Sequence, residues 1–407
     1  MMISYEQLQK ISQDYGNSFY TFNTEKLKEN IETFTKCFTQ SYPKVEIAYS
    51  YKTNYIPYVL GIIDSLGLSP EVVSEMEYDL ATSIGVKLQE IIYNGPVKNR
   101  ASLSKAIFNQ SRINVDSLDE LNLILEILTE TEVKKLEIGI RCNFGANGTS
   151  ISRFGIDVKS QEFEKAIQMI KDSKVLELSG LHCHLPDRDL DSVEWRTNQL
   201  LETALKTFKN APKFLDFGGG FFGSDFATPR EDAVSFGDYA RVITSLVKAA
   251  YPSPHHQPWI ILEPGTALVA NTMNYWTRVV AVKKIESRSI AIVDGSIHEL
   301  SPNSRQSRNP TFHVRVDSIA DTPSEPWHVV GYTCIEDDYL SRDYLSEISK
   351  DDFLGYSHVG SYNVVMKPPF IRPASAVLEL SKNGEVLNVF RETQTLGDIF
   401  SGFRNKN

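Results

Sequence analysis

The chain repeats one pattern along its first two thirds. A short apolar run ends in a polar or glycine-rich tag, and between most of these runs lies a stretch with helical periodicity, as in residues 75–88, 117–128, 161–170 and 194–208. Strand and helix therefore alternate eight times in about 220 residues, which is typical of a closed parallel (β/α)8 barrel. A doubly wound open sheet is the alternative, but no glycine-rich fingerprint follows the first run. The runs are VEIAYSYK (45–52), EVVSE (71–75), IIYNG (91–95), RINVDS (112–117), LEIGIRCN (136–143), LSGLHCH (178–184), KFLDFGGG (213–220) and WIILEPG (259–265).

The pattern changes after about residue 270 to short β-rich runs with turn residues between them, such as TRVVAVKKI, WHVVGYTC and GEVLNVF. These runs predict an antiparallel β domain of roughly 130 residues. The run SFYTFN (18–23) precedes the first barrel strand, and we expect it to pair with that domain. The sequence thus predicts a barrel over residues 25–268 and a β domain built from residues 1–24 and 269–407.

Composition limits the classes of function. With 407 residues, 41% hydrophobic and 23% charged, the chain has enough apolar material for two cores. A net charge of −10 without a basic run argues against nucleic acids and anionic membranes as partners. No apolar stretch is long enough to span a bilayer and the start lacks a signal-peptide core, so we expect a cytoplasmic protein. The four cysteines show no CxxC pairing, which predicts free thiols.

Lys52 ends the first apolar run, and chemistry in parallel barrels takes place where strands end. Side chains alternate along this run, so Ala48, Ser50 and Lys52 are expected to share one face. An amine behind two small residues has room to form an imine with a bulky aldehyde. A solvated lysine closing an ordinary strand is the alternative, and the position of Lys52 within the repeat favours the reactive amine.

Two other strand ends carry residues suited to a phosphorylated, planar ligand. Gly218, Gly219 and Gly220 would leave backbone amides bare for a phosphate, although a tight turn would need only one glycine. Glu263, fixed by the following proline, could hold a pyridine nitrogen protonated. An acid that caps a helix is an equally common interpretation of an isolated glutamate.

His182 and His184 are expected on one face of a strand and flank Cys183. A metal site is disfavoured, because zinc needs three or four converging ligands and no second His/Cys pair has ligand spacing. We interpret His184 as an imidazole that stacks on a planar ligand. His182 is better interpreted as a packed, hydrogen-bonded core residue.

Seven dispersed motifs support one family resemblance. In their order and spacing the sequence resembles the fold-type III pyridoxal 5'-phosphate (PLP) decarboxylases, in particular the diaminopimelate and ornithine decarboxylase group, over essentially its whole length. This resemblance implies an alanine racemase-like barrel and a β domain. The motifs are YSYKTN with Lys52, SRFG (152–155), GLHCH (180–184), LDFGGG (215–220), EPG (263–265), GYTC with Asp338 four residues on, and GSYN (360–363).

The resemblance implies a role for each matching residue. Lys52 would hold PLP as an internal aldimine, His184 would stack on the ring, and Glu263 would pair with its nitrogen. The chain would then remove the α-carboxylate of an amino acid through a quinonoid intermediate. A homodimer with shared active sites is expected, in which Cys334 reaches the neighbouring site and protonates the α-carbon. The phosphate would be bound by Gly218, Gly219, Gly220, Gly265 and Tyr362, with Thr266 beside them.

The phosphate site departs from the family in two places. The usual arginine after EPG is Thr266 here, so one contact changes from charged to neutral. The glycine and serine that normally follow the stacking histidine are replaced by Leu185 and Pro186, which removes a second donor.

The substrate site departs as well. The residue after the cysteine is normally acidic and receives a distal ammonium, but here it is Ile335, an apolar side chain that cannot stabilise a buried charge. The arginine that grips a distal carboxylate is missing, and Arg305 could replace it only if its loop bends inward. Asp294 and Glu336 are the remaining candidates for polar contacts, each with a turn or surface acid as its alternative.

These departures lead to an unusual or conjugated amino acid as the expected substrate, from a siderophore or peptide-antibiotic pathway. The alternatives are a diaminopimelate, ornithine or lysine decarboxylase, and an amino-acid racemase on the same fold. A regulatory protein that binds the cofactor without catalysis is the non-enzyme alternative.

Overall fold

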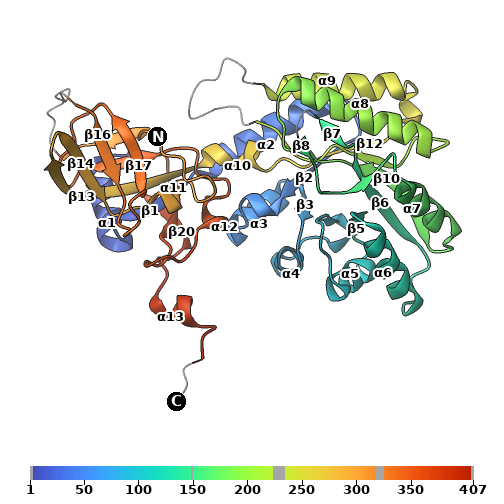
Figure 1. Ribbon diagram of the computed structural model, residues 1–407, viewed down its shortest axis with the longest axis horizontal. Coiled ribbons are helices and arrows are strands. Elements are labelled where there is room, and N and C mark those ends of the chain that lie inside the picture. The colour runs from blue at the N-terminus through green and yellow to red at the C-terminus, as the bar shows by residue number, and fades with distance from the viewer. Residues whose placement is uncertain (1–2, 148–149, 223–233, 317–324, 405–407) are drawn as a thin grey trace. The chain divides into compact units, whose positions relative to one another are not determined.

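The computed structural model describes residues 3–147, 150–222, 234–316 and 325–404. The chain divides into two compact units (Figure 1). One unit comprises Asn30–Ser224 and Arg230–Ala267, and the other comprises Met1–Glu29, Asp225–Pro229 and Leu268–Asn407. Each is described by itself below.

The first unit, called the barrel unit, contains a closed parallel sheet. Its strands pair in chain order, β12 pairs with β2, and β6 pairs with β10, so the ring has no open edge. The predicted (β/α)8 barrel is confirmed. The barrel strands are β2 (Val45–Ser50), β3 (Ser69–Val72), β4 (Ile92–Tyr93), β5 (Arg112–Val115), β6 (Leu136–Asn143), β10 (Leu176–His182), β11 (Phe214–Asp216) and β12 (Trp259–Leu262).

Helices surround this sheet (Figure 1). Several of them begin at a serine whose hydroxyl accepts a hydrogen bond from the N–H three residues on, as at Ser74, Ser117, Ser160 and Ser235. The serine directly before each of these four helices thus marks where the helix begins. The helices are α2 (Thr24–Thr39), α3 (Pro57–Ser65), α4 (Glu75–Ile84), α5 (Arg100–Phe108), α6 (Leu118–Thr129), α7 (Gln161–Asp172), α8 (Leu190–Thr207), α9 (Phe236–Ala250) and the short α10 (Thr266–Val269). Three short strands, β7 (Ala146–Asn147), β8 (Ser150–Ile151) and β9 (Ile156–Asp157), follow β6.

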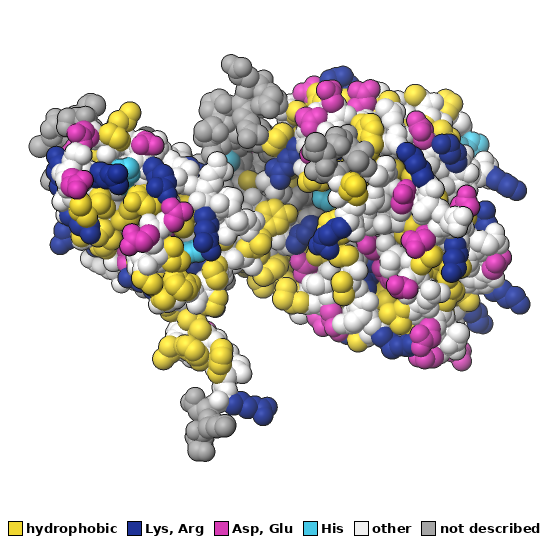
Figure 2. All heavy atoms as spheres, viewed as in Figure 1, with side chains coloured by type: hydrophobic (Ala, Val, Ile, Leu, Met, Phe, Trp, Pro, Cys, Tyr) yellow, Lys and Arg dark blue, Asp and Glu magenta, His cyan; other side chains and the backbone are white. Residues whose placement is uncertain are grey.

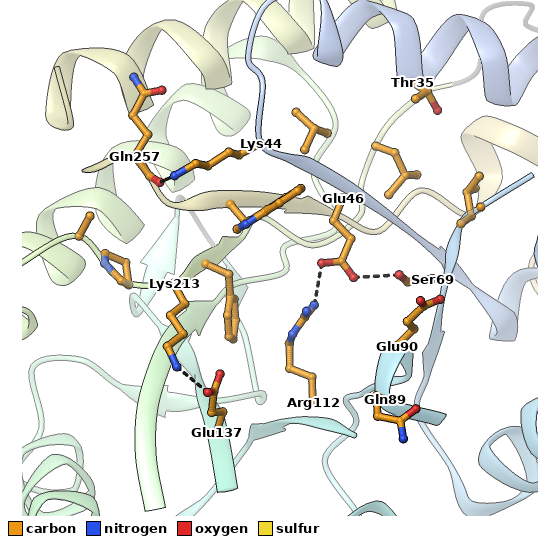
Figure 3. Close-up of a pocket in the computed structure, with 18 of the residues that line it drawn as sticks. Thr35, Lys44, Glu46, Ser69, Gln89, Glu90, Arg112, Glu137, Lys213 and Gln257 are labelled. Atoms are coloured by element: carbon orange, nitrogen blue, oxygen red, sulfur yellow. Dashed lines mark hydrogen bonds and ion pairs between the residues drawn. The ribbon is translucent and has the colours of Figure 1, made fainter. Parts of the chain in front are cut away.

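Paired charges line a pocket at the amino-terminal end of the barrel. Glu46 of β2 and Arg112 of β5 form an ion pair of 3.0 Å, and the Arg112 guanidinium lies 5.1 Å from the centre of the Phe214 ring (Figure 3). Lys213 pairs with Glu137 at 2.5 Å in the same pocket. This pocket lies at the strand starts, whereas Lys52 follows the end of β2. The pocket is therefore at the end of the barrel opposite to the predicted chemistry.

The second unit, called the β unit, is a mixed sheet. β1 (Ser18–Phe22) pairs with β13 and β19, which confirms that the N-terminal run joins this unit. The expected purely antiparallel pairing is wrong for β1–β19 and β14–β16, which are parallel. Long connections separate both pairs along the chain, and a parallel pair requires such a connection. The other strands are β13 (Met273–Ile285), β14 (Arg288–Val293), β15 (Phe312–Val314), β16 (Trp327–Val330), β17 (Tyr339–Tyr344), β18 (Phe353–Tyr356), β19 (Ala376–Leu380) and β20 (Val386–Arg391).

The core of the β unit is built on large apolar side chains. Phe19, Trp276, Phe353 and Leu378 are buried together with the inner face of α1 (Tyr5–Tyr15). Three short helices, α11 (Ile297–Leu300), α12 (Asn363–Met366) and α13 (Leu396–Phe400), complete the unit. No helix among the described residues of the chain is long and apolar enough to cross a membrane.

Candidate functional site

The Lys52 amine lies at the carboxyl end of β2 and faces other barrel residues. Strand β2 ends at Ser50, and Lys52 lies in the 3₁₀ turn η1 (Tyr51–Thr53) that follows it. The alternation of side chains expected through Lys52 therefore stops before this residue. Its Nζ lies 2.5 Å from Glu71 Oε2 and 3.5 Å from Ser50 Oγ. The Ser50 hydroxyl donates to the same Glu71 oxygen at 2.7 Å. The Lys52 side chain is 33% exposed and Glu71 is buried, so the amine is reachable yet anchored.

A buried amide connects this lysine pair to the end of β12. Asn94 follows β4, and its Nδ2 donates to Glu71 Oε1 at 3.1 Å and to Glu263 Oε1 at 2.5 Å. Asn114, at the end of β5, donates in turn to Asn94 Oδ1 at 2.9 Å. The two carboxylates are therefore held in one hydrogen-bonded network by amides that follow or end neighbouring strands.

Glu263 is kept ionised by its neighbours. Burial would raise the pKa of Glu263, but His182, with Nε2 3.5 Å from Glu263 Oε2, and Lys52 outweigh this and hold the pKa below its ordinary value. Burial and the Glu263 charge raise the pKa of Asp216 well above its ordinary range, so the proton of this pair resides on Asp216. The site thus presents a carboxylate rather than a carboxylic acid.

His182 is buried, as expected, but neither of its ring nitrogens makes a hydrogen bond with the described residues. The expected packed position is confirmed, and the polar group that the ring faces is the Glu263 carboxylate, at a distance of 3.5 Å from Nε2. His182, Asp216 and Glu263 place ligand atoms within 4.8 Å of one another, a spacing that could also admit a metal ion. The amide donor of Asn94 already occupies one Glu263 oxygen.

Two backbone amides of the glycine segment 218–220 donate hydrogen bonds to side chains of the barrel. The Gly218 N–H donates to Asp216 Oδ1 at 2.9 Å, and the Gly219 N–H donates to His184 Nδ1 at 3.0 Å. The prediction of three bare amides is therefore wrong for these two glycines. A Cβ on Gly219 would lie 2.7 Å from the Glu263 carbonyl oxygen, so close packing also requires glycine there.

His184 is an uncharged ring, and the hydrogen bond from Gly219 determines which of its nitrogens carries the proton. Burial, and then the positive charge of Lys52, lower the pKa of His184 well below its ordinary value. Because Nδ1 accepts the Gly219 hydrogen bond, the proton of the neutral ring lies on Nε2. The result is an uncharged, flat ring with a fixed orientation at the end of the barrel.

Amides that remain open lie on two adjacent turns. Within the described part of the chain, the N–H groups of Gly220, Gly265 and Thr266 donate to no protein acceptor. Gly220 has a φ of 86°, and a Cβ on Gly265 would overlap Thr53 Oγ1, so both turns need glycine. The Thr53 hydroxyl is itself buried without a hydrogen bond. These groups could accept an anionic ligand.

In the β unit, an acid holds the segment that carries Cys334. Asp338 is buried and accepts hydrogen bonds from Ile297 N at 2.8 Å, Ser296 Oγ at 3.1 Å and Thr333 N at 3.1 Å. Cys334 is exposed within this chain, so the alternative of a buried inert thiol is wrong. All four cysteines are free thiols, as predicted.

The remaining predicted residues of the β unit lie as follows. Tyr362 has a φ of 63° and caps α12, so its backbone is held in the left-handed region. Ile335 is partly exposed and Glu336 is exposed. Asp294 forms an ion pair with Arg372, which leaves it neutralised within its own chain. Beside α12, Lys367 and Glu299 form a buried ion pair of 2.9 Å.

Glu71, Asn94 and Asp216 are site residues to which the motifs assigned no role. Each is a polar residue within, or directly after, an otherwise apolar strand, in SPEVV, IIYN and KFLDF. A polar side chain in such a strand must find a buried partner, and that signal could have identified all three.

The barrel residues fit the cofactor that the resemblance implies. A reachable lysine amine, a neutral flat imidazole and an ionised carboxylate are connected through Asn94 and Glu71 at the carboxyl ends of the strands. Open amides at Gly220, Gly265 and Thr266 provide for a phosphate. The roles of the individual residues toward PLP remain predictions.

Known proteins of one kind match this chain. A family model described as "Pyridoxal-dependent decarboxylase, pyridoxal binding domain" matches residues 26–270. The diaminopimelate decarboxylase of Aquifex aeolicus is 27% identical, covering 93% of this chain and 90% of the relative. That of Archaeoglobus fulgidus is 28% identical, covering 96% and 93%.

Solved structures agree on the fold. The crystal structure of diaminopimelate decarboxylase from M. jannaschi superposes with a TM-score of 0.87 at 23% identity, covering 98% of this chain and 94% of that one. Lysine/ornithine decarboxylase from Vibrio vulnificus gives a TM-score of 0.76 at 16% identity, covering 93% and 99%. With a family model that matches the barrel, the chain belongs to the pyridoxal-dependent decarboxylases, which use PLP to remove the carboxylate of an amino acid.

Proposed function

We propose that this enzyme removes the α-carboxylate of an amino acid that carries a second, distal amine, of the diaminopimelate, lysine or ornithine type. The supporting observation is that relatives named diaminopimelate decarboxylase match it along more than nine tenths of its length. PLP, when bound, takes up the electron pair that remains when carbon dioxide leaves. The family match favours decarboxylation over the racemase and the non-catalytic alternatives.

The barrel residues would each have one task. Lys52 would provide the amine that binds the cofactor aldehyde, with Glu71 holding it in place at 2.5 Å. His184, neutral and oriented by Gly219, would lie against the ring face as a flat, uncharged stacking partner. Glu263, kept ionised, would stabilise a positive charge on the ring nitrogen.

The unusual substrate expected from the sequence gains no support from the relatives, whose names point to diaminopimelate. One observation still favours a second candidate. Ile335 stands where an acid would receive a distal ammonium, and Asp294 is already paired with Arg372. An amino acid whose distal amine is acylated would need neither charge.

A carbon dioxide release assay separates the two candidates. Purified enzyme with PLP is offered diaminopimelate, lysine and ornithine, and each is compared with lysine acetylated on its distal amine. We expect turnover of at least one of the three amino acids with a free distal amine, at a kcat/KM above that of the acetylated lysine. Faster turnover of the acetylated compound would overturn the proposal in favour of the second candidate. In Lys52→Ala, the visible absorbance of bound cofactor and all carbon dioxide release should be lost.

We also propose a homodimer in which Cys334 of one chain serves the site of its partner, delivering a proton to the substrate α-carbon. Cys334 is exposed in its own chain, on a segment fixed by Asp338. Figure 2 shows apolar side chains on the surface of the C-terminal segment around α13, where Leu396 is 72% and Phe403 71% exposed. Such a surface favours burial against a second chain.

Mixed dimers test the sharing of sites. Lys52→Ala and Cys334→Ala chains are co-expressed with different tags, and the heterodimer is purified. If sites are shared, one of its two sites is intact, so about half of the wild-type turnover should return while both mutant homodimers stay slow. A heterodimer as slow as the homodimers would contradict the sharing. A fully active Cys334→Ala homodimer would remove Cys334 from the mechanism.

A further inference from the structure

Arg196 is a buried cation that forms no ion pair with the described residues, although Asp187 and Asp189 lie near enough to act on its charge. It lies on the inner face of α8, on the same stripe as Val193, Leu200 and Ala204, and it is 0% exposed. No carboxylate of the described chain lies within ion-pair distance of its guanidinium. A charge at an apolar stripe position is unfavourable unless something compensates it.

Its hydrogen bonds satisfy only part of the guanidinium. NH1 donates to the carbonyl oxygens of Leu185 at 3.0 Å and of Asp187 at 3.3 Å. Nε and NH2 are buried and have no acceptor among the described residues. Two donors of a planar fork are therefore left open, and such a fork binds phosphate and carboxylate oxygens well.

The guanidinium lies against the glycine turn. A Cβ placed on Gly220 would be 2.9 Å from NH1 of Arg196, and the Phe221 ring centre is 5.8 Å from the guanidinium carbon. The Gly220 N–H likewise has no acceptor in the part of the chain that the structure describes. Arg196 also contacts the loop of Leu185, where this sequence has lost the usual phosphate donor.

We propose that Arg196 provides the positive charge that binds the phosphate of PLP, in place of the arginine that is absent at Thr266. The proposal rests on PLP being the cofactor, and it assigns a residue that the motifs do not indicate. The phosphate would bring the missing negative charge to Arg196. In return, the open Nε–H and NH2 donors would replace those lost at Thr266 and Pro186.

A purely structural role is the alternative, because NH1 already supports two loop carbonyls. The two roles differ in their dependence on the phosphate. Apoenzyme is therefore titrated with PLP and, separately, with pyridoxal, which has the same aldehyde and ring but no phosphate. Binding is followed by tryptophan fluorescence quenching and cofactor absorbance, without substrate.

For Arg196→Gln we expect PLP binding weakened by about 10- to 100-fold, the range of one charge-assisted hydrogen bond. Pyridoxal affinity should change by less than about threefold, because the change removes only phosphate contacts. Arg112→Gln is the matched control: it removes a guanidinium at the opposite end of the barrel and should leave the preference for PLP over pyridoxal unchanged. Arg196→Lys keeps the positive charge but lacks the paired guanidinium donors, so it should lose part of the preference for PLP over pyridoxal. This variant replaces Arg196→Gln if the latter does not fold.

Each outcome has one meaning. An equal loss of affinity for PLP and pyridoxal in the Arg196 variants would show a structural role and overturn the inference. An unchanged preference would overturn it as well. Wild-type enzyme that binds PLP no better than pyridoxal would instead contradict the use of the phosphate altogether, and wild-type enzyme that binds neither would contradict the cofactor.

Discussion

Glu77 offers a test of the electrostatics around Lys52 that needs no substrate. It lies in the first turn of α4, is 3% exposed, and its Oε2 accepts a hydrogen bond from Val73 N at 2.7 Å. Burial raises the pKa of Glu77 to about 7. The charge of Glu71 adds to this rise, whereas the hydrogen bond from Val73 and the charge of Lys52 reduce it. Glu77→Gln is therefore expected to stabilise the protein at and above neutral pH.

The sign and size follow from the two pKa values of Glu77. Its pKa rises from 4.5 in the unfolded chain to about 7 in the fold, so the folded state prefers the neutral form. The stability from this preference is complete below pH 4.5 and is lost as the pH rises through 7. At about 1.4 kcal/mol for each pH unit between the two values, the loss totals about 3.5 kcal/mol. Glutamine is neutral at every pH and keeps the acceptor for Val73, so Glu77→Gln avoids this loss.

Urea unfolding of both proteins from pH 5 to pH 8, followed by tryptophan fluorescence, measures the effect. The difference in unfolding free energy, Glu77→Gln minus wild type, should grow by about 2 to 3 kcal/mol across this range, while other titrating groups cancel. Glu75→Gln is the control in the same helical turn. Hydrogen bonds from Asn99 and Lys105 lower the pKa of Glu75, so its difference should stay flat or change in the opposite direction. Parallel curves for Glu77→Gln and wild type would refute a buried carboxyl that titrates near neutral pH.

Three further changes test the pairs around the site. Lys98 and Glu120 form a buried ion pair of 2.8 Å, so Lys98→Met leaves Glu120 buried without its counter-charge. The unfolding free energy, measured in urea, should fall by about 3 to 5 kcal/mol, and a loss below about 1 kcal/mol would contradict this. Lys367→Met does the same to Glu299 and should lower the melting temperature of the β unit, measured by the fluorescence of its tryptophans, with no shift as the opposing result. Glu263→Gln should retain cofactor absorbance while kcat falls by roughly 10²- to 10³-fold, because the carboxylate is replaced by a neutral amide; unchanged turnover would remove Glu263 from the mechanism.

The barrel could be predicted from sequence because each of its strands carries a local signal. An apolar run followed by a polar tag marks a strand end, and the closed ring then follows from the number of βα units. The parallel β1–β19 pair in the β unit could not be predicted in this way. The alternation along SFYTF shows which face is buried, but it carries no information about the direction of a partner strand more than 350 residues away.

The site residues also divide into those that a local sequence pattern predicts and those that depend on distant partners. Lys52 and Glu263 were found because each ends a strand, and a strand end is visible in the sequence. The hydrogen bond of Gly219 was not, because its acceptor, His184, reaches the turn from the end of a different strand. Such pairings depend on packing between strands, which a pattern along one strand does not encode.

The charges at the carboxyl ends of the strands are coupled through the side-chain amide of Asn94. Asn94 donates one hydrogen bond to Glu71, the partner of Lys52, and one to Glu263, the acid kept ionised by its neighbours. An uncharged group that donates to two carboxylates stabilises both without adding a positive charge beside the lysine amine. A cation at this position would bind both acids more strongly but would compete with Lys52 for Glu71. The amide therefore allows the barrel to hold two buried acids near each other while Glu71 remains paired with the amine.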